Sequence, residues 1–256
     1  MDNNKNHFEK THFGFKEVDR DEKSNLVKNI FSNVAKKYDL MNDLMSAGTH
    51  RLWKNQMINH IDFFDNMQFI DVAGGTGDIA FRILRKAQEK SLKCHIEVVD
   101  INPEMLAVGR SRAVDLNLFS SANFIECDGE KLNYPDESFD VFTIAFGIRN
   151  FTNIDKGLQE AYRVLKKGGK FICLEFSKID DIFLQKIYDT YSFKIIPKIG
   201  EFVLKDKDSY QYLVESIRKF PNQNNFKQMI ENAGFSNVAY QNLTFGVCAI
   251  HYGYKN

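Results

Sequence analysis

Apolar residues recur at helical spacing near the start of the chain and form short continuous runs further on. The first repeat predicts a helix from about Asp19, and a second repeat predicts another over 51–61. Residues 1–17 show neither a helical nor a strand period. We therefore expect a mobile arm over 1–18 and N-terminal helices within 19–66. The apolar face of the first helix consists of Leu26, Val27, Ile30, Phe31, Val34 and Tyr38.

Beyond residue 66, short apolar runs alternate with helical repeats. This alternation predicts an α/β fold with a mostly parallel sheet and helices on both faces. Two final strands follow a short helix over 226–233 and are joined by a link containing Gly246, which predicts an antiparallel hairpin. The helix before the fifth strand is expected over 154–165, with Gly168-Gly169 as the signal that stops it. The seven predicted strands cover 68–73, 95–100, 123–128, 139–147, 170–177, 238–243 and 247–252.

An insertion over 178–221 separates the fifth strand from the C-terminal elements. Its pattern is mostly helical and rich in Tyr, Phe and Lys, so we expect a helical lid on a single domain over 19–256. Tyr188 and Tyr191 in this lid, with Tyr38 and Met41, are candidates for lining a substrate channel. For the lid tyrosines taken one at a time, a place in the ordinary core is the more common outcome.

Composition excludes some classes of protein. The formal net charge is zero, which disfavours a nucleic-acid binder. The four cysteines form no CxxC pair and the six histidines are scattered, so we expect buried reduced thiols and no metal site. No run approaches the ~20 apolar residues of a membrane span. We expect a cytoplasmic protein, with peripheral contact at the inner membrane left open.

Candidate chemistry begins at the loop DVAGGTGD, residues 71–78, directly after the first strand. Ligands of open parallel sheets bind at the carboxyl ends of strands, where Gly75 and Gly77 allow a tight turn against a ligand. With Thr76 between them, these glycines also fit the dinucleotide fingerprint GxGxxA. The loop alone therefore leaves NAD and S-adenosylmethionine open.

Three acids favour S-adenosylmethionine. Asp71 opens the loop and would lie near a ligand that carries an ammonium and a sulfonium group. Asp100 ends the second strand, where a carboxylate can bind ribose hydroxyls. Asp128, followed by Gly129, ends the third strand, where the adenine should lie. Any one acid could be a helix cap or a solvated turn, but three at successive strand ends indicate a cofactor site.

Longer strings resemble a particular family. KYDLMNDLMSAGTHRLWK, FTIAFGIRNF, YDTYSFKIIPKIG and DSYQYLVESIRKFP are similar to the ubiquinone/menaquinone biosynthesis C-methyltransferase family, and the similarity runs from Thr11 onward. The resemblance implies a Rossmann-like class I methyltransferase fold, S-adenosylmethionine as cofactor and C-methylation of a polyprenylated benzoquinol ring. It leaves open demethylmenaquinol as a second substrate, and a homodimer or larger assembly. The family's cofactor positions correspond to Thr76, Asp100, Asp128 and Gly129, whereas Ala145 replaces a serine found in many bacterial members.

Arg149 and Asn150 follow the fourth strand and are the candidate catalytic residues. Arg149 would stabilise a phenolate or order a water, and Asn150 would orient a quinol oxygen. Arg149 could instead anchor a surface carboxylate. Three other functions remain open at this point: a methyltransferase for another small molecule or RNA, an NAD-dependent oxidoreductase, and a non-catalytic quinone-binding scaffold.

Overall fold

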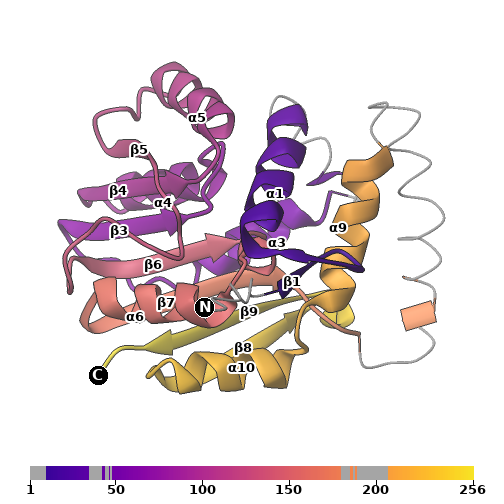
Figure 1. Cartoon of the computed structure of the whole chain (residues 1–256). Helices are drawn as coiled ribbons and strands as arrows, with labels where there is room; N and C mark the ends of the chain where they lie inside the picture. Colours follow the sequence, from indigo (N-terminus) through magenta and orange to yellow (C-terminus); the bar gives the residue numbers. More distant parts are fainter. Residues whose placement is uncertain are drawn as a thin grey trace, which may run out of the picture.

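A seven-stranded sheet forms the centre of the molecule (Figure 1). The structure is a computed structural model that describes residues 10–34, 42–43, 46, 48–179, 185–186, 188 and 207–256. Five strands run parallel, and the last two, β9 and β8, are antiparallel to their neighbours, as predicted. The strand order is β5 (Ala122–Glu126), β4 (Cys94–Asp100), β3 (Met67–Val72), β6 (Phe139–Ala145), β7 (Leu165–Phe176), β9 (Cys248–Tyr254) and β8 (Ser236–Leu243).

Helices cover both faces of the sheet, because alternate strand residues point to opposite sides. On β3, Phe69 belongs to one apolar cluster and Ile70 to the other. The first cluster also holds residues of α3 (His50–Ile58), α4 (Asp78–Glu89) and α5 (Pro103–Asp115). The second holds residues of α6 (Ile154–Val164) and α10 (Gln223–Asn232). The predicted cap of α5 is confirmed, since the Asn102 side chain accepts a hydrogen bond from the N–H of Met105 at 3.0 Å.

The junction of α6 and β7 agrees with the predicted end of the helix but not with the predicted start of the strand. Leu165 is already extended, with φ −75° and ψ 140°, so α6 ends at Val164, one residue before the predicted end, and β7 begins at Leu165 rather than at Lys170. Gly168 and Gly169 lie inside the irregular start of β7, where the register with β6 jumps from Leu165 to Lys170. Gly168 takes a φ of +77°, which glycine adopts without strain.

The N-terminal segment is also more regular than expected. Lys10–Phe13 (β1) and Lys16–Asp19 (β2) form an antiparallel hairpin, so the prediction of no strand in this segment is wrong. Gly14 makes the turn with a φ of +59°, and α1 (Arg20–Val34) follows at once. Strands this short and polar show no clear period in the sequence. Contacts with distant parts of the chain hold the hairpin in place.

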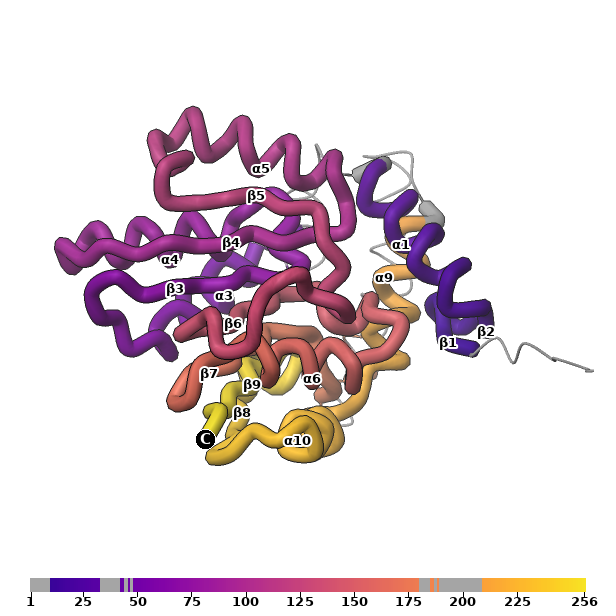
Figure 2. The backbone as a smooth tube through the Cα atoms, turned by 60° about the vertical axis from the view of Figure 1, so that its left-hand side comes forward, coloured from indigo at the N-terminus to yellow at the C-terminus, as the bar shows by residue number. Residues whose placement is uncertain are grey.

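One distant partner of the hairpin is α9 (Lys207–Lys219), the described helix of the insertion. Figure 2 shows the hairpin, α1 and α9 gathered beyond one end of the sheet strands. A 3-10 turn, η2 (Ile148–Asn150), lies between α9 and the end of β6, and a second such turn, η4 (Thr244–Gly246), joins β8 to β9. Among the described helices, none is both long and apolar enough to cross a membrane.

Candidate active site

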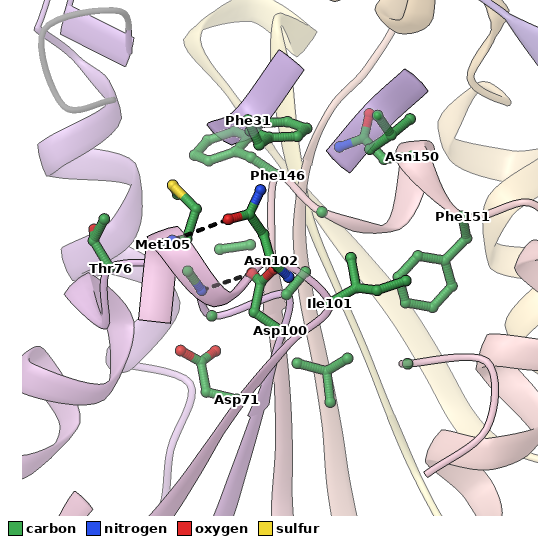
Figure 3. A pocket seen from close by; sticks show the side chains of 18 of the residues that line it. Phe31, Asp71, Thr76, Asp100, Ile101, Asn102, Met105, Phe146, Asn150 and Phe151 are labelled. Carbon is green, nitrogen blue, oxygen red and sulfur yellow. Dashed lines mark hydrogen bonds between the residues drawn. The ribbon is translucent and has the colours of Figure 1, made fainter. Parts of the chain in front are cut away.

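A cavity opens at the carboxyl ends of β3, β4 and β6, where the sequence predicts a ligand (Figure 3). Asp100 ties together two of the loops around it. One carboxylate oxygen accepts a hydrogen bond from the N–H of Gly75 at 2.9 Å, and the other accepts from the N–H of Asn102 at 2.8 Å. Burial raises the pKa of Asp100 to about 6, although these backbone hydrogen bonds oppose the rise.

Asp71 lies at the base of the same cavity and is 1% exposed. Its Oδ1 accepts a hydrogen bond from the Thr143 hydroxyl at 2.8 Å. Within the described residues, its Oδ2 has no hydrogen-bond partner. Burial raises the pKa of Asp71 to about 7. An unsatisfied carboxylate oxygen in a cavity is costly to bury, and a cationic ligand group would satisfy it.

The glycines of this loop pack too closely against neighbouring protein atoms for a larger residue to replace them. A Cβ added to Gly74 would lie 2.8 Å from Oδ2 of Asp71, and one added to Gly75 would lie 2.9 Å from Cε of Met105. Gly75 and Gly77 take φ values of +51° and +79°, which place the start of α4 behind the loop. Gly77 serves this turn and does not itself line the described cavity.

The remaining predicted cofactor positions divide into two groups. Thr76, Gly129 and Ala145 line the cavity, and the Thr76 hydroxyl accepts a hydrogen bond from Arg112 at 3.0 Å. Asp128 is exposed and lies outside the cavity lining as the described residues define it. Its Oδ1 accepts a hydrogen bond from the N–H of Glu130 at 2.8 Å, which is a turn contact.

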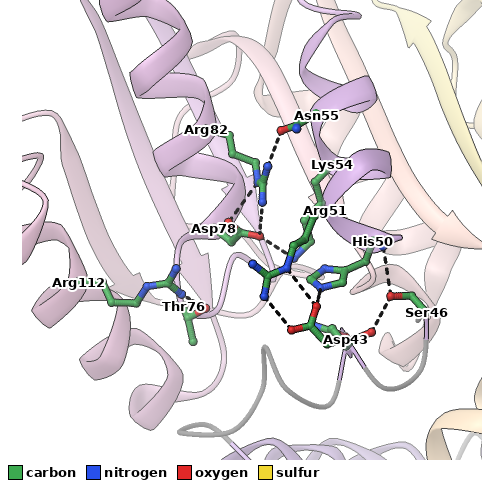
Figure 4. Close-up of polar contacts among 11 residues, drawn as sticks. Asp43, Ser46, His50, Arg51, Lys54, Asn55, Thr76, Asp78, Arg82 and Arg112 are labelled. Atoms are coloured by element: carbon green, nitrogen blue, oxygen red, sulfur yellow. Dashed lines mark hydrogen bonds and ion pairs between the residues drawn. The ribbon is translucent and has the colours of Figure 1, made fainter. Parts of the chain in front are cut away.

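Lys54 is a cavity residue that the sequence patterns did not single out (Figure 4). It projects from α3 and forms an ion pair of 2.8 Å with Asp78, the first residue of α4. Burial alone would raise the pKa of Asp78, but Lys54 and Arg82 together hold it at about 2. The string THRLWK contains Lys54 but gives no sign that its partner lies 24 residues away.

A second missed group joins α1 to the segment after β6. Glu130 is buried, and its carboxylate accepts hydrogen bonds from the N–H and the hydroxyl of Thr152. Lys23 of α1 donates to the carbonyl of Phe151, and burial lowers its pKa to about 8 against the opposing effect of Glu130. These contacts close one wall of the cavity with residues from three separate segments.

The two candidate catalytic residues face different surroundings. Asn150 lines the cavity, on the side opposite Thr76 in Figure 3. Arg149 lines a neighbouring cavity instead and is 7% exposed. Its guanidinium donates to Glu175 at 2.7 Å and lies 5.6 Å from the centre of the Phe176 ring. The carboxylate that Arg149 anchors is thus a buried one, because Glu175 is 1% exposed.

Of the four predicted channel residues, the structure describes one. Tyr188 is half-buried, outside the described cavity lining, and the Arg218 guanidinium lies 5.2 Å from its ring centre. Tyr38, Met41 and Tyr191 lie outside the described residues. The four cysteines are free thiols, and all but the half-buried Cys94 are buried, as expected.

Comparison with known proteins identifies one family of methyltransferases. The sequence model of the ubiE/COQ5 methyltransferase family matches residues 17–255. A Brucella abortus protein named ubiquinone/menaquinone biosynthesis C-methyltransferase UbiE is 53% identical over 95% of this chain and 90% of its own length. The mitochondrial 2-methoxy-6-polyprenyl-1,4-benzoquinol methylase of rice is 52% identical over 97% of this chain and 90% of its own length.

Solved structures agree on the fold. A methyltransferase from Thermotoga maritima aligns with a TM-score of 0.59 at 19% identity, covering 89% of this chain and 99% of the other. A phosphoethanolamine N-methyltransferase from Haemonchus contortus, in complex with S-adenosylmethionine, aligns with a TM-score of 0.57 at 15% identity. That alignment covers 79% of this chain and 52% of the other. At these identities the similarity concerns the arrangement of helices and strands.

Proposed function

The chain belongs to the ubiE/COQ5 methyltransferase family, and from this membership and the cavity described above we propose that it is an S-adenosylmethionine-dependent C-methyltransferase of polyprenylated benzoquinols. One observation carries the proposal. A single cavity brings Asp71 and Asp100, suited to a cationic nucleoside ligand, together with Asn150, suited to a phenolic oxygen. The names of the relatives support demethylmenaquinol as a second acceptor.

The residues present fit the cofactor. The unpartnered Oδ2 of Asp71 is placed to accept a hydrogen bond from an ammonium group, and Asp100 can accept from ribose hydroxyls. The rest of the cofactor would lie against Gly75, Thr76, Gly129 and Ala145, which line the same cavity. Asp128 and Gly77 contribute less directly, because neither lines the described cavity. When bound, S-adenosylmethionine supplies an electrophilic methyl group.

The wall of the cavity that carries Asn150, here called the acceptor wall, would activate the quinol. A ring carbon of a quinol becomes nucleophilic when a neighbouring phenol gives its proton to water, so a donor at that oxygen stabilises the developing charge. After methyl transfer, loss of the proton at the methylated carbon restores the aromatic ring. Asn150 is placed to give such a donor from the end of β6. Phe31, Phe146 and Phe151 line the cavity with apolar surface, which excludes water and strengthens this interaction. Arg149 acts on this wall from behind, through its ion pair with Glu175.

The test is a reconstituted reaction. Purified protein, S-adenosylmethionine labelled in its methyl group and a demethylated short-chain benzoquinol should yield a ring-methylated quinol and S-adenosylhomocysteine. Binding of NADH at the same site, with no methyl transfer, would support the oxidoreductase alternative. Binding of the quinol without turnover would support a scaffold.

We also propose that the protein meets its substrate at a membrane surface, because a polyprenyl tail partitions into lipid. Flotation with liposomes that contain a polyprenyl quinol should carry part of the protein with them. Protein that remains at the bottom of the gradient, with and without the quinol, would argue against this step. The methyl-transfer proposal would stand in either case.

A further inference from the structure

We propose that Tyr212 is a positioning residue that fixes the orientation of the Asn150 carboxamide, so that its NH₂ group faces the acceptor. This inference rests on the proposed function. The Tyr212 hydroxyl donates to Oδ1 of Asn150 at 2.8 Å, from α9, 62 residues along the chain. Asn150 itself lines the cavity, whereas Tyr212 lies behind it and lines the neighbouring cavity.

The direction of the hydrogen bond follows from its acceptor, because Oδ1 of Asn150 can only accept. Tyr212 is 3% exposed, and burial raises its pKa well above its ordinary value. The hydroxyl therefore keeps the proton that it donates. A donor on that side selects the amide rotamer that turns the carbonyl toward Tyr212. The two N–H groups of Asn150 are then left for the cavity, where they can donate to a phenolate oxygen but cannot remove a proton.

Contacts between the N-terminal hairpin and α9 hold Tyr212 in place. Its ring stacks on Phe13 of β1, with ring centres 4.3 Å apart and planes 19° apart. On the same helix, the Glu215 carboxylate accepts a hydrogen bond from the N–H of Phe15 at 3.0 Å. The hairpin and α9 thus brace each other, and together they present one hydroxyl to η2.

Arg149 restrains η2, the turn that contains Asn150. Its side chain donates to the carbonyl of Phe146 and to Glu175, and its N–H donates to the Glu175 carboxylate at 3.4 Å. Backbone and carboxamide of Asn150 are therefore fixed by different partners. Arg149 and Glu175 set the turn, and Tyr212 sets the rotamer of the side chain.

A double-mutant cycle tests the inference. Tyr212→Phe keeps the ring and its stacking but removes the donor, and we expect about a tenfold loss in kcat with unchanged affinity for S-adenosylmethionine. In an Asn150→Ala background, the same substitution should change kcat hardly at all, because the group through which it acts is gone. Thermal melting of each variant reports whether it is folded.

The chain offers a matched control. Tyr240 of β8 also donates to an asparagine, Oδ1 of Asn224 at 3.1 Å, but it is half-buried and does not line the cavity. Tyr240→Phe should leave kcat unchanged. If Tyr212→Phe has no effect in the otherwise native protein, or the same effect with and without Asn150, the positioning role is wrong. If the native protein transfers no methyl group at all, the proposed function fails instead.

Discussion

The two walls of the cavity are built in different ways. On the cofactor wall, each loop directly follows its strand, and Asp100 joins the loops after β3 and β4 through backbone N–H groups. On the acceptor wall, Asn150 depends on Tyr212 of α9, on Phe13 behind that tyrosine and on Glu175 through Arg149. The first wall is a property of the sheet itself. The second exists only when separate segments dock, which lets the acceptor site change while the cofactor site is kept.

The largest effect should come from breaking the ion pair under the acceptor wall. Arg149→Met leaves the Glu175 carboxylate, 1% exposed, without its cation, and should lower the free energy of unfolding by about 3–5 kcal/mol. Chemical denaturation measures this loss. Adding Glu175→Gln to the variant should restore part of the stability. A single variant as stable as the native protein would show that the pair does not hold the turn.

Removing the acceptor-facing donor should come next in size. Asn150→Ala should lower kcat by about 10²–10³, the usual cost of deleting one preorganised donor to a developing oxyanion. Calorimetric titration should show unchanged affinity for S-adenosylmethionine, because the cofactor wall does not depend on Asn150. A parallel loss of cofactor affinity would mean that the two walls are not independent.

The converse substitution addresses the cofactor wall. Asp100→Asn removes a charged acceptor of two backbone N–H groups and should weaken S-adenosylmethionine binding by about 10–100-fold, from 1.5–3 kcal/mol for hydrogen bonds to a charged group. At saturating cofactor, kcat should change far less. A fall in kcat with unaltered S-adenosylmethionine binding would show that Asp100 acts in the reaction and not in binding the cofactor.

The cofactor wall should also show a pH dependence. Burial raises the pKa of Asp71 to about 7 and that of Asp100 to about 6, so these two carboxyl groups hold more protons in the folded protein without ligand than in the unfolded chain between roughly pH 4 and 7. Their contribution to stability should therefore fall as pH rises through that range, while His251, whose pKa burial lowers to about 4, contributes in the opposite direction. A cationic ligand prefers the ionised carboxylates, so its affinity should rise over the same range and level off above about pH 7.

Asp71→Asn is the control for this dependence. It should remove the upper part of the rise, near the pKa of Asp71, and leave the lower part, near the pKa of Asp100. Titration calorimetry across this pH range, with buffers of matched ionic strength, separates the two. An unchanged profile in the variant would show that Asp71 does not face the cation.

The contrast between the walls also explains what could be read from the sequence. Asn102, Pro103 and Glu104 stand in order at the start of a helix, so the cap of α5 and the place of Asp100 beside it follow from local rules. No sequence pattern near Asn150 indicates Tyr212 as its partner, and none near Asp78 indicates Lys54. These partners meet only through tertiary packing. The hairpin at 10–19 does not follow from local rules for the same reason, since one of the elements that it contacts, α9, lies far along the chain.

The position of β9 has a consequence for the order in which the molecule is made. Cys248–Tyr254 lies between β7 and β8 rather than at the edge of the sheet. During synthesis, one side of the largely buried strand β7 therefore keeps unpaired backbone N–H and C=O groups until β9 has been made. That side is a template for strands of other chains until β9 is made. A chain truncated before Cys248 would keep the complete cofactor loop but leave β7 with an open side, in a sheet prone to aggregate.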